Sequence, residues 1–292
     1  MRFDRVLCPV DFSEFSANAY DFAHSLARHY KARLFVLHVV EPLLSIYHGY
    51  MSPAVVEEVY SRQVSDAQEQ VRRLAEGHEG EQVESEVFVQ IGLVADSILS
   101  FAEDHDVDLV VIGTHGRRGL DRLTMGSIAE RILRRTRCAV LTVRERARTF
   151  VSPGSLHEPV RLQRVLCCVD FSENAPRALE YAFSLALQYQ AEITLLHVLE
   201  DSAAGLRTDE QTQTLKCLED LVPVDARNSA TVVPVVRTGK PYEQIIEYAA
   251  QAQTDLIVMG VRGRNALDLA LFGSTTHRVI QLGPCPVLVV KM

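Results

Sequence analysis

The sequence predicts an α/β protein built from two tandem units, each a doubly wound, Rossmann-like sheet of five parallel strands. Two observations predict this fold. The chain repeats itself, and within each copy short apolar runs alternate with segments of helical periodicity. Strands that alternate with helices form parallel sheets with right-handed crossovers. Apolar runs without alternation, such as residues 109–112, suit strands that are covered on both faces.

The repeat is visible residue by residue. The segment RVLCPVDFSE at residues 5–14 recurs as RVLCCVDFSE at residues 164–173, an offset of 159. The tripeptide Leu-His-Val around His38 recurs around His197 at the same offset, but Cys138 matches Cys285 at an offset of 147. Gly113 matches Gly260 at this same offset of 147, so the second copy lacks twelve residues between its second strand and its glycine loop.

Each element of the first unit follows from a local pattern. Ser13 is a suitable N-cap for a helix over 14–30, and Tyr20, Ala23 and Ala27 recur there at helical spacing. The elements expected in this unit are strand 5–10, helix 14–30, strand 34–40, helix 54–75, strand 83–90, helix 94–105, strand 109–112, helix 127–135 and strand 138–143.

The second unit repeats this order with a shorter second helix. Pro176 falls in the first turn of its helix, where proline is tolerated. The elements expected here are strand 164–169, helix 175–189, strand 193–199, helix 209–221, strand 231–236, helix 242–252, strand 255–259, helix 274–282 and strand 286–290. The expected domains are residues 1–146 and 162–292, joined by a linker over 147–161 that contains Ser152-Pro153-Gly154-Ser155.

Composition and charge exclude several classes of function. A net charge of −8 and a pI near 5.7 argue against a broad nucleic-acid surface, which needs many basic groups. No run approaches the roughly 18 apolar residues of a membrane helix, and the chain start has no secretory signal pattern. We therefore expect a cytoplasmic protein that does not bind nucleic acid and does not span a membrane.

The six cysteines fit a reduced, buried role better than a chemical one. Most lie in apolar, strand-like runs, and none forms a CxxC pair. A zinc site or a thioredoxin-like motif is therefore unsupported, and no metal ligand set is expected in the protein. Buried thiols are the preferred interpretation, with redox work as the alternative.

A glycine-rich loop follows the fourth strand of each unit. The pattern glycine, two residues, glycine, nine residues, glycine-serine begins at Gly113 in the first copy and at Gly260 in the second. Glycine lets the backbone approach a ligand closely, and a helix that opens at the glycine-serine pair offers unpaired N–H groups to an anion. An ordinary strand-to-helix loop is the alternative for one copy; two copies with one spacing favour a phosphate site.

Ligands of an open parallel sheet bind at the carboxyl ends of its strands, where the strand order reverses. A nucleotide fits the groups expected there. The loop would take the phosphates, the backbone at Val39 or Val198 would read an adenine edge, and Asp11 or Asp170 would accept hydrogen bonds. The chain contains neither a P-loop nor a GxGxxG after its first strand, and it shows no second acidic cluster and no hydrolytic triad.

Several of these residues have plainer interpretations. The two aspartates could cap the following helices. His38 and His197 are more typical of packed, hydrogen-bonded histidines than of catalytic ones. His115 has Arg262 as its counterpart, which argues against a shared acid–base role. Arg117 and Arg264 could contact phosphate or remain solvated loop charges, as could Arg118 and Arg122.

The residues also resemble a known family. Three segments are similar to motifs of the universal stress proteins: Pro9-Val10-Asp11-Phe12-Ser13, Leu37-His38-Val39, and Gly113-Thr114-His115-Gly116 with Gly126-Ser127. The resemblance occurs once in each half, and the two occurrences together cover nearly the whole chain. The resemblance implies a tandem member of the ATP-binding branch, with a fold like that of the adenine nucleotide alpha hydrolases. It also implies that the two units pair through their last strands as a pseudo-dimer, and that tandem chains form a homodimer. The second unit departs from the pattern at Cys168, where Pro9 stands in the first, and at Val261-Arg262.

The function implied is ATP binding in a stress response, exerted through nucleotide-dependent conformation or through a protein partner that the sequence does not name. Alternatives are a slow ATPase, with at most weak hydrolysis and no expected catalytic residue, and a nucleotide-free scaffold. The expected cofactor is ATP, or ADP or AMP, with Mg²⁺ held through the phosphates. The residues expected to bind it are Pro9, Val10, Asp11, Val39, Ile112, Gly113, His115, Gly116, Arg117, Gly126, Ser127, Ile128, Cys168, Val169, Asp170, Val198, Met259, Gly260, Arg262, Gly263, Arg264, Gly273, Ser274 and Thr275.

Overall fold

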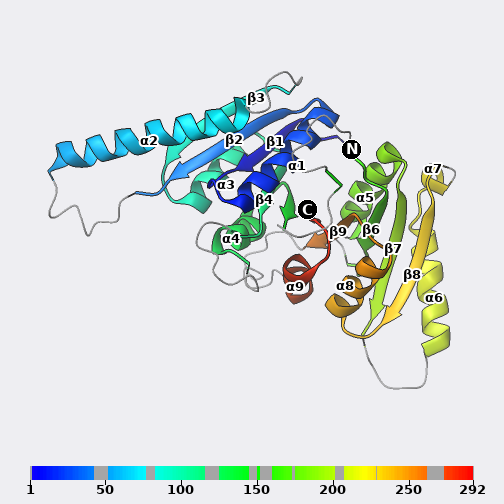
Figure 1. Cartoon of the computed structure of the whole chain (residues 1–292). Helices are drawn as coiled ribbons and strands as arrows, with labels where there is room; N and C mark the ends of the chain where they lie inside the picture. The colour runs from blue at the N-terminus through cyan, green and yellow to red at the C-terminus, as the bar shows by residue number, and fades with distance from the viewer. Residues whose placement is uncertain are drawn as a thin grey trace.

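The protein is an α/β structure in which ten strands form one sheet. The computed structural model describes residues 2–42, 52–76, 83–115, 125–144, 150–151, 160–172, 175–200, 207–227, 229–261 and 273–291. Within these residues the strand order is β3-β2-β1-β4-β5-β10-β9-β6-β7-β8 (Figure 1). Each half contributes five neighbouring parallel strands, so the predicted fold class is confirmed.

The first half forms a doubly wound unit whose strand order reverses between β1 and β4. Its elements are β1 (Arg5–Pro9), α1 (Glu14–Tyr30), β2 (Arg33–Val40), α2 (Pro53–Glu76), β3 (Ser85–Ile91), α3 (Val94–Asp104), β4 (Leu109–Gly113), α4 (Ser127–Arg135) and β5 (Ala139–Val143). The chain runs outward from β1 to β3 and then returns to β4 on the other side of β1. A cleft is therefore expected between the carboxyl ends of β1 and β4.

The second half repeats the arrangement, with the reversal between β6 and β9. Its elements are β6 (Arg164–Cys168), α5 (Ala175–Tyr189), β7 (Glu192–Leu199), α6 (Arg207–Asp220), α7 (Val224–Arg227), β8 (Val232–Thr238), α8 (Pro241–Gln251), β9 (Leu256–Val261), α9 (Ser274–Leu282) and β10 (Val287–Lys291). The single-turn helix α7, which begins directly after Pro223, is the one described helix that the sequence pattern does not predict.

The two halves join through their last strands, as the family resemblance implies. β5 and β10 pair antiparallel, with Leu141 opposite Leu288. The hydroxyl of Thr142 donates to the Val287 carbonyl at 3.1 Å, and Arg144 Nη1 donates to the Gly283 carbonyl at 2.8 Å. The seam makes the chain a pseudo-dimer with one continuous sheet.

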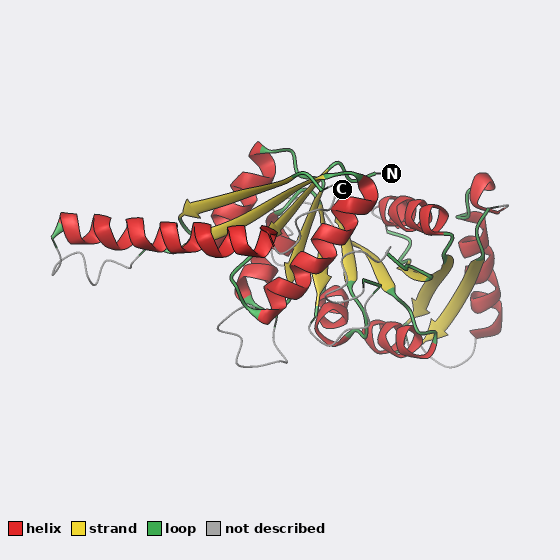
Figure 2. Cartoon of the chain, turned by 45° about the horizontal axis from the view of Figure 1, so that its top comes forward, coloured by secondary structure: helices red, strands yellow, loops and turns green. Residues whose placement is uncertain are grey.

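Helices cover both faces of this twisted sheet (Figure 2). Apolar side chains of α1 and α5 pack in one core cluster, and those of α3, α4, α8 and α9 pack in a second. Side chains of adjacent strand residues point alternately into the two clusters, as a sheet buried on both faces requires.

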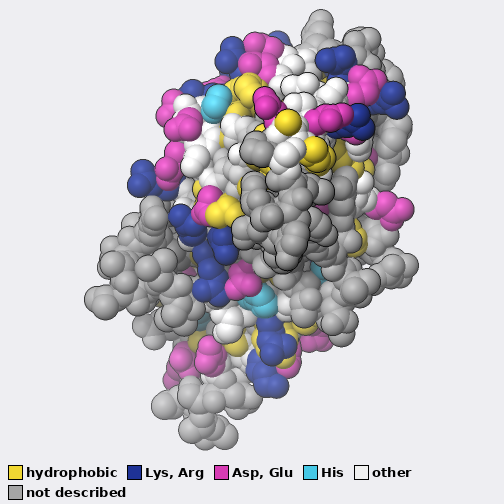
Figure 3. Space-filling view, turned by 90° about the vertical axis from the view of Figure 1, so that its left-hand side faces the viewer, with side chains coloured by type: hydrophobic (Ala, Val, Ile, Leu, Met, Phe, Trp, Pro, Cys, Tyr) yellow, Lys and Arg dark blue, Asp and Glu magenta, His cyan; other side chains and the backbone are white. Residues whose placement is uncertain are grey.

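Helix α2 differs from its counterpart α6 in length rather than in its anchor. α2 has 24 residues and α6 has 14. Val71 of α2 and Leu218 of α6, which are 147 positions apart, are both 0% exposed. Most of the added residues lie before the anchor, because 18 residues of α2 precede Val71 and 11 residues of α6 precede Leu218. α2 extends along one end of the molecule (Figure 1). Acidic and basic side chains intermingle on that end (Figure 3), where Arg62 pairs with Glu58 at 2.7 Å.

Part of the predicted linker, residues 147–161, packs against the first unit. The described residues Phe150 and Val151 are buried. The Phe150 ring meets the Phe22 ring edge-on, with a centroid distance of 4.9 Å, and the Phe150 carbonyl accepts from Arg161 N at 2.9 Å. This segment therefore contributes to the core as well as connecting the units.

The structure also bears on the cysteines and on membrane insertion. All six cysteines are free thiols; Cys8, Cys167 and Cys285 are buried, whereas Cys217 is exposed. Burial raises the pKa of the Cys167 thiol to about 12, so that thiol stays protonated at neutral pH. Among the described residues, none of the helices is long and apolar enough to cross a membrane, and no group of three or more metal-ligating side chains occurs.

Candidate functional site

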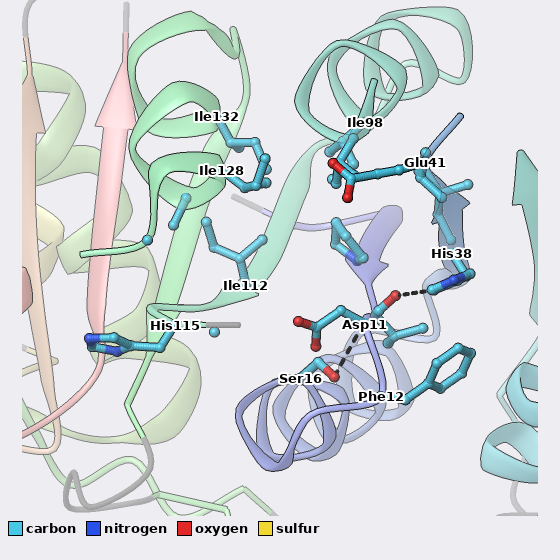
Figure 4. Close-up of a pocket in the computed structure, with 18 of the residues that line it drawn as sticks. Asp11, Phe12, Ser16, His38, Glu41, Ile98, Ile112, His115, Ile128 and Ile132 are labelled. Atoms are coloured by element: carbon cyan, nitrogen blue, oxygen red, sulfur yellow. Dashed lines mark hydrogen bonds between the residues drawn. The ribbon is translucent and has the colours of Figure 1, made fainter. Parts of the chain in front are cut away.

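A cavity of about 940 Å³ opens at the carboxyl ends of β1, β2 and β4, where the strand order reverses (Figure 4). This volume is near the upper end of the roughly 300–1,000 Å³ typical of small-molecule sites. Every first-half residue that was expected to bind a cofactor and is described lines it. These residues are Pro9, Val10, Asp11, Val39, Ile112, Gly113, His115, Gly126, Ser127 and Ile128.

The turn between β1 and α1 forms the floor of this cavity. Asp11 Oδ1 accepts from the backbone N–H of Ser13 at 3.0 Å and from its hydroxyl. This bracing holds Phe12 at φ 61°, a left-handed conformation that is uncommon for a large side chain. Ser13 Oγ then accepts from Ser16 N at 3.2 Å and caps α1. Asp11 thus shapes the turn, while Ser13 is the N-cap that the sequence predicts.

His38 at the end of β2 is a packed, hydrogen-bonded residue, as its sequence context favours. Its Nδ1 lies 2.7 Å from the carbonyl oxygen of Val10. A carbonyl can only accept, so Nδ1 carries the proton. The ring lies against Phe12 with a centroid distance of 4.5 Å. His38 therefore ties β2 to the β1–α1 turn.

The loop after β4 brings a helix N-terminus to the cavity. A Cβ on Gly113 would lie 3.0 Å from the backbone oxygen of Phe15, so this glycine permits close approach of α1. Thr114 N donates to Val143 O at 3.0 Å and Gly126 N donates to Thr114 O at 2.9 Å. These bonds close the loop and fix Gly126 as the N-cap of α4, and no side chain caps the helix there.

This geometry leaves the first turn of α4 suited to an anion. The backbone N–H groups of the first turn have no intrahelical acceptor, and the helix dipole places about half a positive charge at that end. Ser127 and Ile128 in this turn both line the cavity. A phosphate could accept hydrogen bonds from these amides without displacing a side-chain cap.

An apolar wall faces this helix end. Four isoleucines from three elements converge on the cavity: Ile98 of α3, Ile112 of β4, and Ile128 and Ile132 of α4 (Figure 4). Ile98 and Ile132 are nearly inaccessible to solvent, and Ile128 is 36% exposed. Such a surface can cover a flat aromatic ring, because burying apolar area is favourable without hydrogen bonds.

The opposite wall comes from α2 and is polar. Gln63, Asp66, Ala67 and Gln70 line the cavity from α2, and Glu41 lines it from the end of β2. The described lining residues include three carboxylates and no lysine or arginine. Gly116 and Arg117, which were expected to contact phosphate, lie outside the described residues.

The second half reproduces the strand-end turn and the histidine contact of this site. His197 Nδ1 lies 2.7 Å from Val169 O, and Phe171 has φ 55°. The Phe171 and His197 rings are 4.8 Å apart, and Asp170 Oδ1 accepts from Ser172 N at 3.0 Å. The turn geometry is therefore that of the first half.

Other second-half candidates occupy the equivalent strand ends. Val198 is at the end of β7, Met259 and Gly260 are in β9, and Gly273 is the N-cap of α9 without a side-chain cap. Ser274 and Thr275 begin that helix. Arg262, Gly263 and Arg264 lie outside the described residues.

The strand ends differ at one position that changes hydrogen bonding. Val10 N donates to Leu37 O in β2, so the N–H of residue 9 would face β4. Pro9 has no N–H, and β1 pairs with β4 only at Val6 and Leu7. In the second half Cys168 supplies this donor, and β6 pairs with β9 through Cys168 opposite Met259. The cleft between β1 and β4 is therefore less closed by strand pairing.

Cys168 is an inert thiol despite its place at the strand end. Burial, and then the neighbouring Cys167, Cys285 and Asp170, raise its pKa well above the ordinary thiol value. The thiol is therefore protonated at neutral pH and is a poor nucleophile.

Comparison with known proteins agrees with this duplicated architecture. The model of the universal stress protein family matches residues 2–144 and, a second time, residues 161–291. The chain belongs to the universal stress protein family. Each match covers one five-stranded unit, so this is a tandem universal stress protein, as the sequence motifs indicate.

Some relatives match about half of this chain, and others match nearly all of it. Universal stress protein YxiE of Bacillus subtilis is 29% identical in an alignment of 145 residues that covers 44% of this chain and 98% of YxiE. Universal stress protein MJ0531 of Methanocaldococcus jannaschii is 30% identical over 146 residues, 49% of this chain and 83% of that protein. A crystal structure of a universal stress protein from Archaeoglobus fulgidus has a TM-score of 0.73 at 24% identity, covering 99% of this chain and 97% of that one. This last similarity concerns the fold.

Sequence reasoning missed the α2 wall of this universal stress protein. The twelve extra residues of the first unit do not signal it, because the lining residues at 63–70 have counterparts at 210–217 in α6. What the sequence could not show is that a helix packed on one face of the sheet reaches a cavity shared with α3 and α4. That placement depends on the tertiary packing of Val71.

Proposed function

We propose that this universal stress protein binds ATP in its first half and acts in a stress response, through nucleotide-dependent conformation or a protein partner. The observation that carries the proposal is the position of the α4 N-terminus, uncapped by any side chain, in a cavity of nucleotide size at the strand-order reversal. Anions bind at such helix ends, and nucleotides bind at such reversals.

The rest of the cavity supports a nucleoside attached to that anion. The isoleucine wall beside α4 offers a dry surface for an adenine ring. The main chain at Val39 and the carboxylate of Asp11 lie at the same cavity and would offer hydrogen-bonding groups to the base. We include in the proposal Mg²⁺ held through the phosphates and a homodimer of tandem chains, which follow from the family resemblance. We also include the cytoplasmic location that the sequence patterns predict.

The second half supports a weaker site. It has the same turn and an α9 that begins at Gly273 without a side-chain cap, but α6 carries Glu210 where α2 carries Gln63 and Gln213 where α2 carries Asp66. In the second half β6 also pairs with β9 through Cys168, so strand pairing closes its cleft more than the cleft between β1 and β4. We therefore propose that ATP fills the first half at lower concentration than the second.

Isothermal titration of the full chain with ATP and Mg²⁺ tests the proposal. Ser127 is exposed in the first turn of α4, where an aspartate is compatible with the helix dipole but repels phosphate. Ser127→Asp should lower the affinity of the tighter site about 100-fold, as expected for a like charge at roughly 4 Å with partial screening. Ser274→Asp, the same change at α9, should leave the tighter site unchanged.

Two results would contradict the proposal. One is the absence of ATP binding to the wild-type chain at millimolar nucleotide. The other is a Ser127→Asp variant that binds ATP as the wild type does, since the phosphates would then lie elsewhere. Circular dichroism and urea unfolding of both variants provide the check that the fold is intact.

A further inference from the structure

The cavity extends over both faces of the sheet, and this extension assigns a role to α2. Val39, Ile98 and Ile112 belong to the core cluster under α3 and α4. Val71 of α2 belongs to the other cluster, with α1. Because Gln63 and Asp66 of α2 line the same cavity as Ile98 and Ile112, the cavity must pass over the carboxyl edge of the strands. A ligand that fills it contacts groups on both faces.

The α2 wall offers hydrogen-bond acceptors. The Oε1 atom of Gln63 is inaccessible to solvent and accepts no hydrogen bond from the described residues. A buried acceptor without a donor is costly, so a rotation of the Gln63 side chain that presents this oxygen to a ligand donor in the cavity would be favourable. Asp66 adds a carboxylate to the same wall, and Glu41 adds another nearby.

The charges restrict which part of a nucleotide can face α2. Carboxylates repel phosphate, so the triphosphate belongs at the α4 N-terminus on the other side of the edge. The adenine ring belongs on the isoleucines, which are on that same side. The sugar joins base to phosphate, and its two hydroxyls, which donate hydrogen bonds, are the part that remains to face α2.

We propose that Gln63 accepts a hydrogen bond from a ribose hydroxyl of the nucleotide and makes the first-half site selective for ribonucleotides. This inference rests on the proposed function. The residue 147 positions later, Glu210 in the shorter α6, is exposed, so the buried acceptor belongs to the first half.

The test compares two ligands on matched variants of the full chain. Isothermal titration with ATP and with 2′,3′-dideoxy-ATP should show that the wild type prefers ATP about 10-fold, near the upper value for one neutral hydrogen bond. Gln63→Leu should lower the ATP affinity about 5- to 10-fold and leave the dideoxy affinity nearly unchanged. Gln68→Leu, an exposed glutamine of α2 outside the cavity lining, is the control and should change neither.

A second variant separates the acceptor from packing. Gln63→Glu retains an acceptor oxygen and adds a charge, so it should weaken both ligands while keeping the preference for ATP. The inference is overturned if Gln63→Leu leaves the ratio of the two affinities at its wild-type value, or if the wild type does not distinguish the ligands. A wild type that binds neither ligand would overturn the proposed function itself, which is a separate result.

Discussion

The two halves of the molecule share the turn after their first strand and differ in the residues and helix that surround it. In both, a histidine at the end of the second strand lies 2.7 Å from a carbonyl oxygen of the first strand, and a phenylalanine holds positive φ beside it. The strands and the anchors Val71 and Leu218 also correspond. The differences are Pro9 against Cys168 and a 24-residue helix against one of 14 residues. The repeat therefore fixes the architecture, while two local changes set the shape of each site.

The differences at residue 9 and in α2 both affect the cleft at the strand ends. Pro9 withholds the donor that would pair β1 with β4, which leaves the first-half cleft less closed. Gln63, Asp66 and Gln70 of α2 then line that cleft with amide and carboxylate groups, and α6 carries Glu210, Gln213 and Cys217 at the matching positions. The second half has the longer strand pairing. These differences favour the first half as the tighter site of the proposed function.

The largest effect expected from exchanging these features is on stability. Cys168→Pro removes the N–H that faces β9 and leaves an acceptor there without its partner. We expect the free energy of unfolding to fall by about 2 kcal/mol. Pro9→Ala, the reciprocal change, restores a donor toward β4 and should not destabilise the chain. Urea titration of both variants measures this difference, and equal losses in the two variants would contradict the role assigned to residue 9.

A smaller effect is expected at alkaline pH from the thiol of Cys168, which has no counterpart in the first half. Burial, with Cys167, Cys285 and Asp170 nearby, raises the pKa of Cys168 above its unfolded value of 9.0. Above pH 9 the unfolded chain loses this proton before the folded chain does, so stability falls as pH rises. Cys168→Ala should make the loss between pH 8 and pH 10 smaller by about 1 kcal/mol.

Urea unfolding at the two pH values measures that loss. Cys217→Ala, which removes an exposed thiol, is the control and should keep the wild-type pH dependence. A Cys168→Ala variant that loses as much stability as the wild type would show that this thiol does not couple folding to pH.

Much of the fold could be predicted from the sequence because local and global signals agree. The helices at 14–30, 127–135, 175–189 and 274–282 have the predicted bounds, since each has a clear start signal or apolar spacing. The seam between β5 and β10 came from the family resemblance rather than from the strands themselves, whose apolar patterns do not specify a partner.

The candidate site was predictable where it consists of strand ends and glycines. Asp11 and Gly126 meet at the cavity because parallel strands end at one edge. Ile98 and Gln63 could not be found in this way. An isoleucine in a helix is predicted to lie in the core, and a glutamine in a polar helix is predicted to be exposed to solvent. Their roles depend on which helix faces reach the sheet edge, and this is set by packing between distant segments.

The most direct test of the central claim is a crystal structure of the full chain grown with ATP and Mg²⁺. The account predicts density for the triphosphate at the backbone amides of Ser127 and Ile128, with the adenine against Ile98 and Ile112. Density for the nucleotide elsewhere, or a first-half cavity filled by the protein's own side chains, would contradict it.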